Sequence, residues 1–485
     1  MPLNRNAFRL EWRLPAPQPE ANGSAALRIA EVAVSLPPVV SAPPWLAEAA
    51  WIEVTGATKP KEELLVLLSL GAEVEHALLV QYLYALASLD PNGSPGTRQI
   101  RDIVKQIALQ EMAHFVSVQN LLLAVGGLDY LHIGRDSLRA ASAQNPLPFA
   151  LEPVSELTLS EYVLVESPGD IPDQSLADRI SKMKELVKQK AGIEPHQVGA
   201  FYTQVYWILQ PGDEPHGPLP LTPDPAHGRK PGWHLKASDF TPAQVIASYQ
   251  AQPLEWKVNS GPDLLILPVG DANTPPEKMA DLALSNLFSI MAQGEGVAPS
   301  QNSHFEKFLA ALDLQLAGGV NVLPLPRTPY VQAPPPDSLA PTRLRKDYTV
   351  LWGKLFDIRY TMLPLDIGLA LSMSVTNPDR ATLKGWAFVS MRPLLRLLIT
   401  QMCSPALTNL EPCGPTFGLL EEDLPAGPRA PWERYLKLLQ EEAAVIAALE
   451  RRPELTGDTS GSDLLSDIKT NSAQRLQFVQ HKLAS

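Results

Sequence analysis

A chain of 485 residues, 45% hydrophobic and 19% charged, has the composition of a globular protein with a substantial core. Its net charge of −12 argues against a nucleic-acid partner or an anionic membrane surface, both of which attract basic proteins. Only Cys403 and Cys413 are present, which excludes a disulfide framework and favours the reducing cytoplasm. We also expect neither a signal peptide nor a membrane span, because no long apolar run occurs.

Residues 1–60 contain one segment, AALRIAEVAVSL, that could form a strand or a short helix. The prolines that follow it keep the chain extended. We see no chemistry in this region and expect it to cover the helices that follow.

Residues 60–89 predict the first long helix, which ends at the turn Asp90-Pro91-Asn92-Gly93. Glu75 lies on its apolar face, at helical spacing from Leu68 and Leu78. The next residue, His76, points about 100° away from that face. Glu73 lies on a different face again, and we expect it to face solvent or to pair locally.

Residues 97–126 predict a second helix, which ends at Gly126-Gly127. Glu111 and His114 are three residues apart and share one face with an apolar stripe. A short turn joins the two helices, so antiparallel packing would bring Glu75 close to Glu111. Their repulsion would then require a cation or a shared proton. Two interpretations stay open: a self-satisfied Glu–His pair, or half of a dinuclear metal site.

Residues 128–192 are loop-rich, and Glu166 ends a short apolar segment just before Pro168. Glu166 is either a cap or surface acid, or a ligand that enters the core from a helix end. Residues 195–210 predict a third bundle helix. The insertion at 210–275 is long enough to be a lid or binding loop, and its irregularly spaced histidines are not expected to be ligands.

The fourth helix is predicted over residues 276–294, and Glu295 continues its apolar face. The chain then breaks at glycine and proline and resumes a helix near Ser303, a favourable N-cap residue. His304 opens that continuation. A helix interrupted between Glu295 and His304 could still direct both side chains at one centre.

Residues 341–485 predict further helices, which could close a substrate cavity or form a homodimer contact. The last segment is expected to be peripheral, with His481 exposed to solvent. The predicted organisation is therefore a cover segment at 1–60, a helical bundle at 61–330 and a C-terminal helical region at 341–485.

Three motifs, in order, resemble one known family: EHALLVQYLYA, then Glu-x-x-His with NLLLAVGG, then QGEG followed by SHFEKF. They are similar to the ferritin-like family that contains the iminophenyl-pyruvate dimer synthases of violacein- and rebeccamycin-type bisindole pathways. The resemblance covers about residues 62–315 and continues weakly through LFDIRYTMLPLDI and GPTFGLL. It implies an all-α fold: a ferritin-like four-helix bundle with long loop insertions and an additional C-terminal helical region.

The resemblance also implies a buried non-haem metal centre. Its ligands, carried over position by position, are Glu75, Glu111, His114, Glu166, Glu295 and His304. Oxygen and imidazole donors suit iron, expected here as two ions, and manganese fits the same set. Family members often carry acids around the Phe-Tyr of the third helix, where this chain has Ala200 and Thr203. The second metal site would then be weaker, use Glu166, or be missing.

Tyr82 and Tyr202 lie on or near core faces, where they either assist the centre or simply pack. The resulting functional hypothesis is an O2-dependent oxidase or oxygenase in natural-product biosynthesis. Its substrate would be a small molecule, with an amino-acid-derived imine as one candidate. Two alternatives are an iron-handling ferroxidase and a non-catalytic helical scaffold. Storage cages use small protomers, which fits a chain of 485 residues badly.

Overall fold

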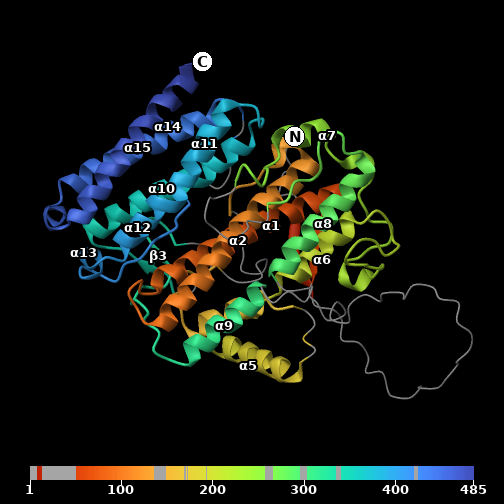
Figure 1. The fold of residues 1–485 in the computed structure, drawn as a ribbon, viewed down its shortest axis with the longest axis horizontal. Helices are drawn as coiled ribbons and strands as arrows, with labels where there is room; N and C mark the ends of the chain where they lie inside the picture. Colours follow the sequence, from red (N-terminus) through yellow and green to blue (C-terminus); the bar gives the residue numbers. More distant parts are fainter. Residues whose placement is uncertain are drawn as a thin grey trace, which may run out of the picture.

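The computed structural model describes residues 8–13, 51–135, 149–168, 171, 173–192, 194–256, 266–294, 303–334, 340–419, 424–425 and 427–484. Within these ranges the protein is mainly helical (Figure 1). It also contains two small two-stranded sheets. The predicted all-α class is confirmed. No helix of the described residues is long and apolar enough to cross a membrane.

Two long helices, α1 (Pro60–Ser88) and α2 (Pro95–Gly126), form the centre of the bundle and pack along each other. Their bounds lie within two residues of the predicted ones. Ser94 caps α2 by accepting a hydrogen bond from the backbone N–H of Thr97. Nearly all of α1 is buried on every side, whereas the sequence predicted a single buried face. Its other faces are covered by segments distant in the sequence.

Two further helical rows of the bundle are each interrupted. One consists of α4 (Glu156–Val165) and α6 (Val198–Leu209), and the other of α8 (Pro276–Gly294) and α9 (His304–Leu316). Helix α4 packs on α9, and α6 packs on α8. Helix α5 (Gln174–Ala191) lies in the first interruption and packs against α4.

The N-terminal strands β1 (Arg9–Arg13) and β2 (Trp51–Thr55) pair antiparallel, and β2 lies against α6. The side-chain amide of Gln204 bonds to both backbone groups of Ile52, which attaches the strand to the bundle. The predicted segment AALRIAEVAVSL lies outside the described residues.

The loop after α2 and the long insertion contain short helical elements that the sequence did not predict. They are η3 (Leu128–Tyr130), η4 (Pro225–His227), η5 (Ala237–Asp239) and α7 (Ala243–Tyr249). The histidines of the insertion pair with nearby acids, His216 with Asp281 and His234 with Asp213. His227 likewise bonds to Asp224. These pairs account for the histidines without a metal.

The C-terminal region packs its helices around α10 (Asp347–Leu371), which contacts both α11 and α14. A short parallel pair, β3 (Pro329–Tyr330) and β4 (Thr342–Arg343), precedes it. The other elements are α11 (Pro378–Val389), the π-helical η6 (Ser390–Leu394), α12 (Leu395–Met402), α13 (Pro405–Thr408), α14 (Ala430–Glu450), η7 (Pro453–Gly457) and α15 (Thr459–Ala484).

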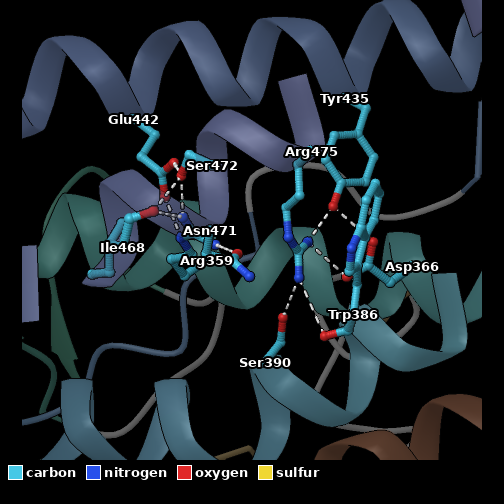
Figure 2. A network of polar contacts seen from close by, with 10 residues as sticks. All are labelled: Arg359, Asp366, Trp386, Ser390, Tyr435, Glu442, Ile468, Asn471, Ser472 and Arg475. Carbon is cyan, nitrogen blue, oxygen red and sulfur yellow. Dashed lines mark hydrogen bonds and ion pairs between the residues drawn. The ribbon is translucent and has the colours of Figure 1, made fainter. Parts of the chain in front are cut away.

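Helix α15 is more than the peripheral segment that the sequence predicted. His481 is exposed as expected, but Arg475 is fully buried. Figure 2 shows its guanidinium pointing at Asp366 and Tyr435, with Ser390 and the Trp386 carbonyl on its other side. A second buried guanidinium, Arg359 of α10, bonds to Glu442, Asn471 and Ser472. Two buried arginines therefore connect α10, α11, α14 and α15.

We predict that Arg475→Met lowers the free energy of unfolding by about 3–5 kcal/mol, because it leaves the buried carboxylate of Asp366 without its cation. The matched control is Lys469→Ala, which breaks the pair with Glu450 at the surface and should cost less than about 1 kcal/mol. Urea denaturation of the two variants and the wild type measures the difference. Equal losses in both variants would contradict this account.

Candidate metal centre

A small cavity of about 10 Å³ lies between the middles of α1 and α2 and the two interrupted rows. That volume is about what one water molecule or one ion requires. Its lining comes from both long helices and from the ends of α4, α6 and α8: Glu75, Leu78, Glu111, His114, Glu166, Val198, Tyr202, Ile290, Met291 and Gly294.

Glu111 lies between two histidines at this cavity. Its Oε2 is 3.3 Å from His114 Nδ1, and its Oε1 is 2.7 Å from His304 Nδ1. The two imidazole rings stack with their centroids 5.4 Å apart. One potential ligand atom from each of the three residues lies within 4.8 Å of the others. This group could hold a metal ion.

Two further carboxylates flank the group, one on each side. Glu75 Oε2 lies 3.5 Å from His114 Nδ1, and Glu166 Oε1 lies 3.6 Å from His304 Nδ1. Each half of the centre therefore has one imidazole, one outer carboxylate and one oxygen of Glu111.

A tyrosine hydroxyl bonds to each outer carboxylate. Tyr202 of α6 donates to Glu75, and Tyr82 of α1 donates to Glu166 Oε1 at 2.6 Å. Both tyrosines are almost fully buried. They contact the ligand candidates directly, so they do more than fill space.

Helix capping explains how the two interrupted rows place Glu166 and His304 at the centre. Glu166 is the residue at which α4 ends, and its backbone N–H bonds to the carbonyl of Tyr162. Ser303 caps α9, because its hydroxyl accepts from the N–H of Glu306. This places His304 in the first turn of α9, as the sequence predicted.

The structure brings together Glu75, Glu111, His114, Glu166 and His304, while Glu295 lies outside the described residues. Glu166 is the C-cap residue of α4 and is buried, so it is not a surface acid. The role of these residues as ligands stays a prediction.

Burial and mutual charge shift the proton affinities of the group. Burial and the charge of Glu111 raise the pKa of Glu75 to about 8. Burial also opposes ionisation of Glu111, but the neighbouring His304 and bonds from Glu75 and His114 hold its pKa well below the usual value. Burial lowers the pKa of His114 and of His304, yet the carboxylates beside them, Glu111 first, raise both overall. In the metal-free protein, protons on Glu75, His114 and His304 therefore balance the charge that metal ions could balance instead.

The ring of His304 indicates that this donor set fits a metal. The ring is completely buried, yet neither of its nitrogens makes a hydrogen bond in the described structure. Its Nδ1 is close to Glu111, but the contact lacks hydrogen-bond direction. A buried nitrogen without a partner costs about 1–3 kcal/mol, and coordination of an ion would remove that cost.

Sequence reasoning missed two features of the surroundings. The expectation for Glu73 was wrong: its side chain is 1% exposed and lies 2.6 Å from Nε2 of His132, on a loop that covers α1. Gln293 was not considered, although its Oε1 lies 2.8 Å from Nε2 of His114. Its position in the QGEG motif, one residue before the end of α8, was the available signal.

His76 does point away from the centre, toward the hydroxyl of Tyr360.

The raised pKa of Glu75 predicts how the stability of the metal-free protein depends on pH. The folded protein keeps this proton up to about pH 8, whereas the unfolded chain releases it near pH 4.5. The folded state therefore binds more protons between these values, and stability falls as pH rises through them. Glu75→Gln cannot ionise and lacks this contribution.

Thermal unfolding of chelator-treated wild type and Glu75→Gln, at several pH values between about 5 and 8, measures the effect. We expect the wild type to lose stability relative to the variant as pH increases. Parallel pH profiles for the two proteins would show that Glu75 titrates in its usual range.

Two comparisons with known proteins agree with this fold. Residues 68–217 match the family model described as ferritin-like, and this segment contains Glu75, Glu111, His114 and Glu166. The chain is also similar to the 2-imino-3-(indol-3-yl)propanoate dimerase of Chromobacterium violaceum, with 30% identity over 153 residues. The alignment covers 26% of this chain and only 15% of that relative. No solved structure matches the chain.

The family resemblance is thereby confirmed for residues 68–217, which contain the first two of the three motifs. The relative is named as an enzyme. Because the match spans about a seventh of its length, its reaction is not transferred to this chain by similarity alone.

Proposed function

We propose that this chain, whose residues 68–217 form a ferritin-like domain, is an O2-dependent oxidase or oxygenase with two irons bound in the bundle. One observation carries the proposal: Glu111 lies between His114 and His304, with an additional buried carboxylate beside each histidine. Di-iron and di-manganese bundles use Glu and Glu-x-x-His ligands. This site has one such pair, Glu111 and His114, and adds His304 from the start of α9.

The donor set divides into two halves that share Glu111. His114, Glu75 and Oε2 of Glu111 would hold one ion, and His304, Glu166 and Oε1 of Glu111 the other. Glu166 offers the carboxylate that Ala200 and Thr203 of the third helix do not. Manganese remains an option for the same donors.

Bound iron would supply oxidation, with O2 as the electron acceptor. The chain's own residues prepare the site. The hydroxyls of Tyr202 and Tyr82 orient the outer carboxylates and keep a proton within one hydrogen bond of each half. Apolar side chains of the lining exclude bulk water: Leu78, Val198, Ile290 and Met291.

We propose a small imine-type substrate derived from an amino acid. The support is the similarity to a protein whose name specifies an indole-bearing 2-imino acid. One observation favours the ferroxidase alternative instead: a cavity of about 10 Å³ admits an ion but no molecule of that size. Gel filtration separates this alternative where it involves a storage cage, because a cage would elute far above a dimer.

The first prediction of this proposal concerns metal content. After anaerobic Fe(II) loading and removal of free metal, elemental analysis should give about two irons per chain, as in di-iron bundles. Glu111→Gln should lose most of this iron, because both halves use its oxygens. Glu161→Gln is the matched control: Glu161 is also buried, but burial alone raises its pKa, so it stands outside the charged group.

The result distinguishes the open alternatives. A wild-type protein that binds no metal under these conditions would contradict the metal centre and favour the non-catalytic scaffold. One iron per chain would mean that only one half of the centre is competent.

A second prediction separates an oxidase from a ferroxidase. Iron-loaded protein should consume O2 faster when a 2-imino acid is generated in the cuvette, and Glu111→Gln should abolish the increase. Consumption that depends only on added Fe(II), and is unchanged by the imine, would favour iron handling.

A further inference from the structure

We propose that the last two residues of α8, Gln293 and Gly294, are positioning residues for the two halves of the centre. Gln293 fixes the ring of His114, and Gly294 provides the space that Glu166 occupies. This inference rests on the proposed metal centre but concerns residues that are not its ligands. It assigns a function to the last described turn of α8.

The two ring nitrogens of His114 face different partners. Nδ1 lies 3.5 Å from Glu75 and 3.3 Å from Glu111, inside the group that would hold the ion. Nε2 lies on the opposite side of the ring, 2.8 Å from Oε1 of Gln293. A neutral imidazole that donates its Nε2–H to this amide oxygen keeps the Nδ1 lone pair free for a metal. Gln293 therefore selects the tautomer that the centre needs.

The ring of His304 lacks an equivalent support. In the described structure its Nε2 has no hydrogen-bond partner, so its orientation depends on the start of α9, on the carboxylates beside Nδ1 and on the stacked ring of His114. The two halves are thus unequal, although their ligand types match. We infer that the His114 half binds the first ion and binds it more tightly.

Gly294 serves the other half by its lack of a side chain. A Cβ at this position would lie 3.3 Å from Glu166 Oε2, closer than most real Cβ contacts. Glu166 is constrained, because its other oxygen accepts from Tyr82 and lies near His304. A methyl group here would therefore displace the carboxylate from the position it holds between Tyr82 and His304.

The test is a chelator competition that resolves the two metal equivalents of the full-length protein, with Co(II) as the probe ion. Gln293→Met preserves side-chain length but removes the acceptor, and should weaken the tighter equivalent by about 10–100-fold, the usual cost of such a loss. Gln293→Glu restores an acceptor and should recover the affinity. Gly294→Ala should weaken the other equivalent selectively.

Gln189→Met is the matched control, because it makes the same exchange at an exposed position of α5. It should bind both equivalents as the wild type does. Visible absorption of bound Co(II) gives a second measurement, because a reoriented imidazole changes the ligand field even where the protein folds normally.

Each outcome decides between the possibilities. If Gln293→Met binds both equivalents with wild-type affinity, or if Gln293→Glu is no better than Gln293→Met, the positioning role is overturned. If the wild type binds no metal, the proposed metal centre itself fails, which is a different result. If Gln293→Met does not fold, Gln293→Glu against the wild type still tests whether a carboxylate acceptor maintains the tighter site.

Discussion

The balance of charge among buried side chains governs this centre. Ionised Glu111 is buried, and a buried carboxylate is tolerated only where positive charge and hydrogen bonds surround it. Two histidines supply that charge when they carry protons, and metal ions would supply it by displacing those protons. The surrounding side chains hold these charged groups in place. The two tyrosines bond to the outer carboxylates, the outer carboxylates lie beside the histidines, and Gln293 bonds to the ring of His114.

Much of the bundle could be predicted because its signals are local. Helical periodicity located α1, α2 and α8 within two residues, and Ser303 marked the start of α9 through its capping side chain. The spacing of Glu111 and His114 placed both on one face. Local signals also explain why the interruption between α8 and α9 could be anticipated, since glycine and proline mark where a helix cannot continue. The pairing of α4 and α6 into one row was not predicted.

The missed features depend on contacts between distant segments. Glu73 is buried because the loop with His132 covers that side of α1. Arg475 is buried because Asp366 of α10 pairs with it and hydroxyls of α14 and η6 accept hydrogen bonds from it. A single charged residue in a sequence does not identify such partners. His76 is a further example, because it follows Glu75 directly and bonds to Tyr360 of α10. Through this contact the C-terminal region packs on the helix that bears Glu75.

The interruption of two helical rows adds a backbone contribution to the electrostatics of the centre. A continuous helix carries its partial charges only at the ends of the bundle, far from the middle. Here α4 ends beside the cavity and brings partial negative charge, while α6 and α9 begin beside it and bring partial positive charge. His304 belongs to a positive end and Glu166 to a negative one. The electrostatic potential in the cavity therefore depends on the positions of these helix ends as well as on the side chains that line it.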